Sequence, residues 1–184
     1  ILADFTLPVA LPLAGLAAAR RVAFFPGSTI GNFDPLEAVA LLRRMAHDAG
    51  PGGGLVIGVD LRKDERTLVR AYDDPEGVTA AFDLNLLVRI NRELGADFRV
   101  GRFRHRAVFD ARLSRVEMHL ESLEPQRVHV AGRPFSFREG ETIHTESSYK
   151  WELGAFDALA AIAGWSPERT WTDERAWFAV RLYR

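Results

Sequence analysis

The chain of 184 residues contains no cysteine, which excludes disulfides and thiolate metal sites and is consistent with the cytoplasm. The chain also lacks an excess of charge of either sign. Lysine and arginine number 24 against 25 acidic residues, so the composition provides no basic surface for nucleic acid. No apolar run reaches the length that spans a bilayer, and the start lacks the features of a signal peptide. We therefore expect a cytoplasmic protein without nucleic-acid or membrane partners.

Two classes of chemistry lack their usual sequence patterns. The five histidines show no metal-ligand spacing, so we expect no metal site. No serine or histidine occupies a nucleophile elbow. Metalloenzyme and hydrolase functions therefore have little support.

One stretch, residues 22–33, organises the rest of the chain. Val22 to Phe25 form an apolar run, which predicts a strand buried on both faces of a parallel sheet. A turn follows, and Asp34 then begins a helix as its N-cap, with Pro35 in the first turn and Glu37 three residues on. Ligands of open α/β sheets bind at this kind of strand end.

The turn between that strand and helix has the composition of a ligand-binding loop. Gly27 and Gly31 permit a close approach of the backbone to a ligand, and Asn32 offers both donor and acceptor atoms. The alternative is an ordinary strand-to-helix connection.

The rest of the chain reads as an α/β fold with an insertion. We expect helices at 34–49, 64–72, 78–94 and 153–163, a buried strand at 55–61 parallel to the first, and a closing antiparallel pair at 169–172 and 176–183. In the third helix Phe82, Leu86, Ile90 and Leu94 are in register. Residues 2–5 read as the end of a strand, and a helix can begin only after Pro12.

Alternating apolar and polar residues between 116 and 151 predict an antiparallel meander inserted into the fold. Within its last strand, at 143–151, residues two apart face the same way. Glu146 and Ser148 should therefore point together, with His144 and Lys150 on the same face. This pair could hold a ring nitrogen, and Met118 could supply an adaptable apolar wall. The alternative is the solvated face of an edge strand.

Tyr72 ends a short predicted helix directly before Asp73-Asp74-Pro75. Its hydroxyl either points into a cleft or belongs to a half-buried surface tyrosine. Taken alone, the position favours the surface tyrosine.

Five segments, in this order, carry a resemblance to a known family: FFPGSTIGNFDP, AYDDPEGVTAAF, RVEMHLES, IHTESSYKW and WFAVRLYR. Together they resemble the histidine-specific methyltransferases of ergothioneine biosynthesis. That family transfers methyl groups from S-adenosyl-L-methionine to the α-amino nitrogen of L-histidine and produces the trimethylated betaine. The resemblance extends over nearly the whole chain and implies an S-adenosylmethionine-dependent N-methyltransferase.

The resemblance also implies roles for individual residues. Asn32 and Tyr72 match the residues that hold the substrate carboxylate, and Glu146 and Ser148 match those that hold the imidazole, with Met118 beside them. Gly27 and Thr29 match the substrate side of the loop. Asp4 and Phe5 match the acidic and aromatic pair at the adenine of the cofactor.

The family pattern is only partly present. The glycine-rich turn and the ribose-binding acid of a class I methyltransferase do not precede Asp4. The chain thus resembles the carboxyl-terminal part of a Rossmann-like methyltransferase, whose partner would be the missing amino-terminal half of the same fold. We expect a partial core at 1–62 and 152–184 and an inserted helical and antiparallel β substrate-binding subdomain at 63–151. The alternative function is a catalytically incomplete amino-acid-binding module.

Overall fold

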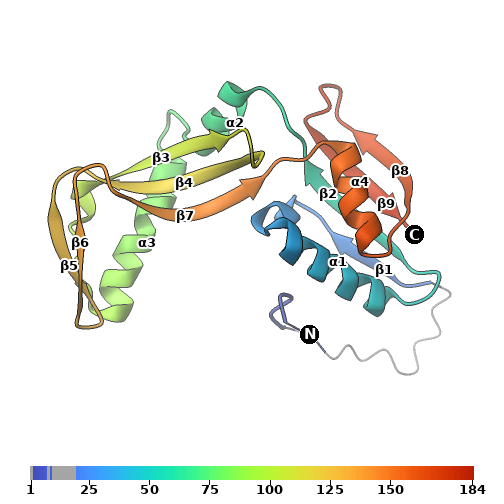
Figure 1. The fold of residues 1–184 in the computed structure, drawn as a ribbon, viewed down its shortest axis with the longest axis horizontal. Helices are drawn as coiled ribbons and strands as arrows, with labels where there is room; N and C mark the ends of the chain where they lie inside the picture. Colours follow the sequence, from blue (N-terminus) through green and yellow to red (C-terminus); the bar gives the residue numbers. More distant parts are fainter. Residues whose placement is uncertain (1, 8, 10–19) are drawn as a thin grey trace. The chain divides into compact units, whose positions relative to one another are not determined.

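The computed structural model describes residues 2–7, 9 and 20–184 (Figure 1). These residues form two compact units: unit 1 comprises residues 1–62 and 149–184, and unit 2 comprises residues 63–148. The structure groups residues 149–151 with unit 1, where Lys150 pairs with Asp60 at 2.8 Å. The helix expected after Pro12 lies outside the described residues. None of the described helices is both long and apolar enough to cross a membrane.

Unit 1 is a mixed four-stranded sheet with the strand order β1-β2-β9-β8. β1 and β2 are parallel, as predicted, whereas β9 is antiparallel to both of its neighbours. The elements of this unit are β1 (Val22–Phe25), the 3-10 turn η1 (Thr29–Asn32), α1 (Pro35–Ala49), β2 (Gly54–Asp60), α4 (Leu153–Ile162), β8 (Pro167–Thr172) and β9 (Phe178–Tyr183). The predicted closing pair is therefore confirmed as β8 and β9.

The predicted start of α1 is confirmed in detail. The Asp34 carboxylate accepts hydrogen bonds from the amides of Leu36 and Glu37, and the Glu37 side chain accepts from the amide of Asp34. This reciprocal cap satisfies helix donors that would otherwise lack partners. α1 and α4 contact each other and cover one face of the sheet, where Leu55, Ile57 and others form the core (Figure 1).

The expectation that β1 is buried on both faces is wrong. Within the part of the chain that the structure describes, β1 is an edge strand, and Val22 and Phe24 are 51% and 71% exposed. Ala23 and Phe25 point the other way and pack against the core under α1. Because side chains alternate along a strand and α1 covers only one face, an apolar run alone did not reveal the open face. Residues 2–5 are also not a strand: Asp4 opens a turn closed by the amide of Leu7.

Unit 2 contains the three-stranded sheet β3-β4-β7 and the two-stranded hairpin β5-β6. Its elements are α2 (Glu65–Tyr72), α3 (Val78–Leu94), the turn η2 (Val100–Arg102), β3 (Phe103–Asp110), β4 (Arg115–Ser122), β5 (Gln126–Val130), β6 (Arg133–Phe137) and β7 (Thr142–Tyr149). The helices α2 and α3 are confirmed, and so are β4 to β7. The strand β3 was not predicted from the sequence.

The two helices of unit 2 pack on one face of the three-stranded sheet. α2 places Leu68 against Ala107 and Val116, and α3 places Leu87 against Phe103 and Leu120. The predicted apolar stripe of α3 is only partly correct: Ile90 packs against the core, whereas Phe82 and Leu94 are exposed and Leu86 lies at the margin. The buried face of α3 includes Asp83, an acidic residue, so the apolar periodicity of the sequence does not identify that face.

Candidate active site

The loop after β1 is fixed at the carboxyl ends of the two parallel strands. Gly27 and Ser28 both have positive φ angles, 74° and 56°, which turn the chain sharply after Phe25. The Ser28 hydroxyl accepts a hydrogen bond from the amide of Asp60 at the end of β2, 2.8 Å away. Ile30 is fully buried and anchors η1 in the core. The loop is thus held in one conformation at the strand edge.

The three predicted residues of this loop lie close together in the sequence and remain accessible. Gly27 and Asn32 are exposed and Thr29 is half-buried. The Thr29 hydroxyl donates to the carbonyl oxygen of Pro26 at 3.4 Å. A rigid backbone with an exposed carboxamide can hold a polar ligand in a fixed orientation.

Phe5 lies beside an apolar cavity of about 500 Å³ in unit 1. Its ring meets Phe25 and Phe33 edge to face, with centroids 5.6 and 6.2 Å apart. The cavity walls also include Leu41, Arg44 and Met45 of α1. An aromatic and aliphatic wall of this kind suits a flat, weakly polar ring.

Asp4, the acidic partner of Phe5 in the sequence, points back to its own turn. Its carboxylate accepts hydrogen bonds from the Thr6 hydroxyl at 2.6 Å and the Thr6 amide at 2.8 Å. These two bonds hold the pKa of Asp4 below its ordinary value. Arg44 donates to the carbonyl oxygen of Thr6 at 2.5 Å and fastens the turn to α1.

In unit 2 the structure brings Tyr72 and Ser148 into direct contact. The Tyr72 hydroxyl donates to the Ser148 hydroxyl at 2.8 Å, across 76 positions of sequence. Tyr72 packs against the cluster of Leu68, Ala107 and Val116. Tyr72 is half-buried, as the surface interpretation expects, and its hydroxyl contacts the predicted ring-binding strand.

Met118 and Glu146 line one cavity of about 200 Å³ between α3 and the sheet. Met118 is buried, and Glu146 is half-buried. The Thr145 hydroxyl donates to the carbonyl oxygen of Met118 at 3.0 Å and holds β7 against β4 here. A cavity lined by a carboxylate and an apolar sulfur side chain can recognise a ring that has both an N–H group and an apolar face.

The wall of this cavity opposite Met118 comes from α3, which the sequence analysis assigned no role. Phe82, Asp83, Asn85, Leu86 and Arg89 line it. Asn85 and Arg89 are four residues apart, and therefore on one face of the helix, which is the signal that could have identified them. Arg89 also forms an ion pair with Glu93 at 3.1 Å.

The predicted face of β7 is only partly correct. His144 stacks on His119 of β4 and contacts Ser147, whereas Ser148 contacts Tyr72. Side chains three positions apart point to opposite faces of a regular strand, so the alternation breaks between His144 and Ser147. His144 therefore does not share a face with Ser148. Lys150 is not on that face either, because it belongs to unit 1 and pairs with Asp60.

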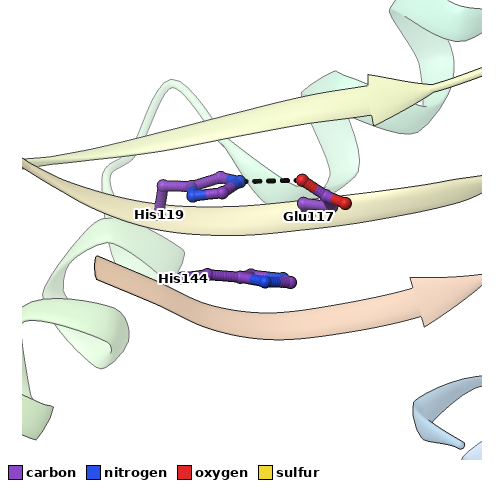
Figure 2. A group of neighbouring side chains, drawn as sticks. All are labelled: Glu117, His119 and His144. Atoms are coloured by element: carbon purple, nitrogen blue, oxygen red, sulfur yellow. Dashed lines mark hydrogen bonds and ion pairs between the residues drawn. The ribbon is translucent and has the colours of Figure 1, made fainter. Parts of the chain in front are cut away.

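On the other face of β4, Glu117 and His119 lie next to His144 of β7 (Figure 2). Their potential ligand atoms lie within 4.8 Å of one another, a grouping that histidine spacing did not predict. Burial opposes the charge on Glu117, but hydrogen bonds from Arg115 and His119 outweigh it and lower the pKa of this carboxyl.

The geometry of this cluster favours a hydrogen-bonded network over a metal centre. The two histidine rings are stacked, with centroids 4.8 Å and planes 21° apart. Arg115 already contacts one Glu117 oxygen at 2.5 Å, and His119 contacts the other at 3.0 Å. A bound cation would have to compete with the Arg115 guanidinium and unstack His144.

Comparisons with known proteins identify the family. A family model described as "Histidine-specific methyltransferase, SAM-dependent" matches residues 1–184. The chain belongs to the histidine-specific methyltransferase family. The resemblance inferred from the five sequence segments is thereby confirmed.

Relatives and a solved structure agree with this membership. The chain is 45% identical over 165 residues to a histidine N-alpha-methyltransferase of Mycobacterium tuberculosis (strain CDC 1551 / Oshkosh), covering 89% of this chain and 51% of the relative. It is 30% identical over 125 residues to ergothioneine biosynthesis protein 1 of Schizosaccharomyces pombe, covering 67% of this chain and 16% of the relative.

The fold is similar to that of the CcbJ methyltransferase from Streptomyces caelestis, with a TM-score of 0.50 and 14% identity over 100% of this chain and 62% of that chain. The α/β fold is thus methyltransferase-like, with a mixed sheet. The chain spans about half the length of the mycobacterial relative, 51%.

Proposed function

We propose that the full-length protein transfers methyl groups from S-adenosylmethionine to the α-amino nitrogen of L-histidine, as a step of ergothioneine biosynthesis. The observation that carries this proposal is the cavity shared by Met118 and Glu146. The family resemblance independently implies that both residues meet the imidazole. Their shared cavity, in the same unit as the Tyr72 and Ser148 hydroxyl pair, supports that assignment.

In this proposal Glu146 and Ser148 orient the imidazole ring. The Glu146 carboxylate would accept a hydrogen bond from one ring N–H, and Met118 would contact the ring face. A half-buried carboxylate selects for a partner that can donate to it, which an apolar ring cannot do.

Asn32 and Tyr72 would hold the substrate carboxylate. In the structure the Tyr72 hydroxyl donates to Ser148. A substrate carboxylate is a stronger acceptor than a hydroxyl, so Tyr72 would donate to it instead. Ser148 would then contact the imidazole. The existing hydrogen bond would thus be exchanged for two bonds to the substrate.

The residues around Phe5 fit part of the cofactor. S-adenosylmethionine supplies an electrophilic methyl group on a sulfonium. The Phe5 ring and the aliphatic wall of its cavity suit an adenine. The Asp4 carboxylate is not part of that wall, because it accepts hydrogen bonds from the Thr6 amide and hydroxyl.

The work left to the chain's own residues is positioning. The α-amine would have to lose its ammonium proton so that its lone pair can accept the methyl group, while bound S-adenosylmethionine would supply that group and keep the C–S bond electrons on sulfur. Such a displacement requires an aligned near-attack geometry rather than a strong base. Fixing the ring at Glu146 and the carboxylate at Tyr72 determines where the amine lies.

Calorimetry on the full-length protein tests the proposal. We expect histidine to bind, S-adenosylhomocysteine to bind, and Glu146→Ala to weaken only histidine binding. Histidine binding without any binding of S-adenosylhomocysteine would favour the amino-acid-binding module. Absence of histidine binding in the presence of the cofactor product would overturn the proposed substrate.

A further inference from the structure

A buried pair, Asp83 of α3 and His105 of β3, lies outside the residues assigned to the substrate. The two side chains are 2% and 1% exposed, and Asp83 Oδ2 lies 2.8 Å from His105 Nδ1. The other ring nitrogen, His105 Nε2, lies 2.7 Å from the main-chain carbonyl oxygen of Tyr72. The pair thus connects α3, β3 and the last residue of α2.

The hydrogen positions in this chain of contacts follow from its acceptors. A carbonyl oxygen only accepts, so His105 Nε2 must carry the hydrogen that it donates to Tyr72. A single hydrogen then lies between His105 Nδ1 and the Asp83 carboxyl. Asp83 therefore fixes the orientation of the ring and keeps Nε2 directed at Tyr72.

Tyr72 needs this support because of its place in α2. The carbonyl oxygens of the last helical turn have no amide donor within the helix. His105 supplies a donor to one of them, the carbonyl oxygen of Tyr72. The Tyr72 hydroxyl, at the far end of the side chain, donates to Ser148 on β7. The tyrosine is thus held by β3 at its main chain and by β7 at its hydroxyl.

Stability alone does not explain this arrangement. Burying a charged or strongly polar pair usually stabilises a fold no more than apolar residues of the same volume. Asp83 lies one helical turn before Leu87, on the core face of α3, where a leucine would pack well. Asp83 also lines the cavity of Met118 and Glu146.

We infer that Asp83 and His105 are positioning residues for substrate recognition, which hold Tyr72 in the orientation that meets the histidine carboxylate. This inference rests on the proposed function. Neither residue needs to touch the substrate or the cofactor. Their loss should therefore weaken histidine recognition and leave cofactor affinity unchanged.

The test compares three variants of the full-length protein with the wild type. Asp83→Leu and His105→Phe remove the hydrogen bonds at similar volume. Asp83→Asn preserves them, because its carboxamide can donate to Nδ1 of a neutral ring that still donates from Nε2. The controls are Asp97→Leu and Asp97→Asn, because Asp97 and His129 form an exposed pair at 3.0 Å in the same unit.

We expect Asp83→Leu and His105→Phe to raise the KM for histidine at least about tenfold, since displaced positioning groups cost one to two orders of magnitude. The Kd of S-adenosylhomocysteine should stay within about twofold of wild type in these variants. The KM of Asp83→Asn for histidine should lie close to the wild-type value. The Asp97 variants should match wild type. An unchanged KM, or an Asp83→Asn variant as impaired as Asp83→Leu, would overturn the inference.

A structural readout separates this inference from the proposed function. Crystal structures of Asp83→Asn and Asp83→Leu report the distance between the Tyr72 and Ser148 hydroxyls whatever the substrate is. We expect hydrogen-bond distance in the first and a longer distance in the second. If Asp83→Leu does not fold, His105→Gln takes its place. Wild-type protein that leaves histidine unmethylated refutes the proposed function, whereas an unmoved Tyr72 in the variants refutes the positioning role.

Discussion

The carboxylate of Glu146 is the group on which substrate choice depends in the proposed function. It lines the cavity with Met118, and no other residue given to the imidazole carries a negative charge. Removing a charge-assisted hydrogen bond costs about 1.5–3 kcal/mol, which is roughly a ten- to hundredfold loss. We therefore expect Glu146→Ala to lower kcat/KM for histidine by about that factor.

Combining Glu146→Ala with Met118→Val should also change the choice of ring. The double substitution enlarges the cavity and removes its charge, so a larger and less polar ring becomes relatively better accepted. The measurement is the ratio of kcat/KM for histidine to that for tryptophan in the full-length protein. Glu139→Ala, an exposed acid of the same unit, is the control. An unchanged ratio would show that Glu146 and Met118 do not contact the ring.

Asp74 makes the stability of unit 2 depend on acid pH. Hydrogen bonds from the hydroxyl and amide of Thr79, and from the amide of Val78, lower the pKa of Asp74 to about 2 from its ordinary 3.8. The folded pKa lies below the unfolded one. This carboxylate therefore stabilises the fold above its ordinary pKa and loses that contribution as the pH falls toward 2.

We expect Asp74→Asn to flatten the acid branch of the stability curve. The melting temperature of the variant should fall less steeply than that of wild type between about pH 5 and about pH 2. Asp73→Asn removes one neighbouring charge and should retain the wild-type slope. Parallel curves for Asp74→Asn and wild type would contradict the role of Asp74.

Among the helices, α1 has the most completely satisfied start, and this start connects directly to the candidate ligand loop. Asp34 accepts from two amides, each at 2.9 Å. We expect Asp34→Ala to lower the free energy of unfolding by about 1 kcal/mol, within the range of about 0.5–2 for such caps. Asp34→Ser, which can also cap, should lie close to wild type.

Urea denaturation distinguishes these two variants. The midpoint should fall in Asp34→Ala at unchanged m-value and recover in Asp34→Ser. Equal losses in both variants would indicate that the Asp34 charge, rather than its capping geometry, stabilises α1.

The helices of this fold could be predicted because their ends are marked locally. Asp34, Asp64 and Gly95 lie where the structure begins or ends a helix. Burial could not be predicted as well. The apolar run of β1 looked buried on both faces because nothing in the run tells which face α1 covers. β3 was not predicted because its buried face includes His105. A polar residue at that position hides the alternation of apolar and polar residues that marks a strand.

The sequence predicted those site residues that a local pattern or motif marks. It did not predict contacts between elements that are far apart in the chain. Glu146 was predicted to hold the ring with Met118 as an apolar wall, and both residues line one cavity in the structure. The contact of Tyr72 with Ser148 joins α2 to β7 and has no local signal. The separation of His144, which contacts His119, from Ser148, which contacts Tyr72, likewise has no local signal, because strict alternation places both on one face.

At the scale of the whole molecule, each unit carries residues that the family resemblance assigns to the substrate. Asn32 belongs to the rigid loop of unit 1, and Tyr72, Met118, Glu146 and Ser148 belong to unit 2. We expect Asn32→Ala to raise the KM for histidine by about tenfold, through loss of a hydrogen bond to a charged carboxylate. Arg62→Ala, in the same unit, is the control. A normal KM in Asn32→Ala would remove the loop from the substrate site.

The central claim is that the full-length protein methylates the α-amine of histidine. Its most direct test incubates the purified full-length protein with S-adenosylmethionine carrying a labelled methyl group and an equimolar mixture of free amino acids, followed by mass spectrometry of the products. The predicted result is label on histidine, with fragmentation that places every added methyl on the α-nitrogen. Label on another amino acid but not histidine, or on the imidazole ring, would contradict the claim.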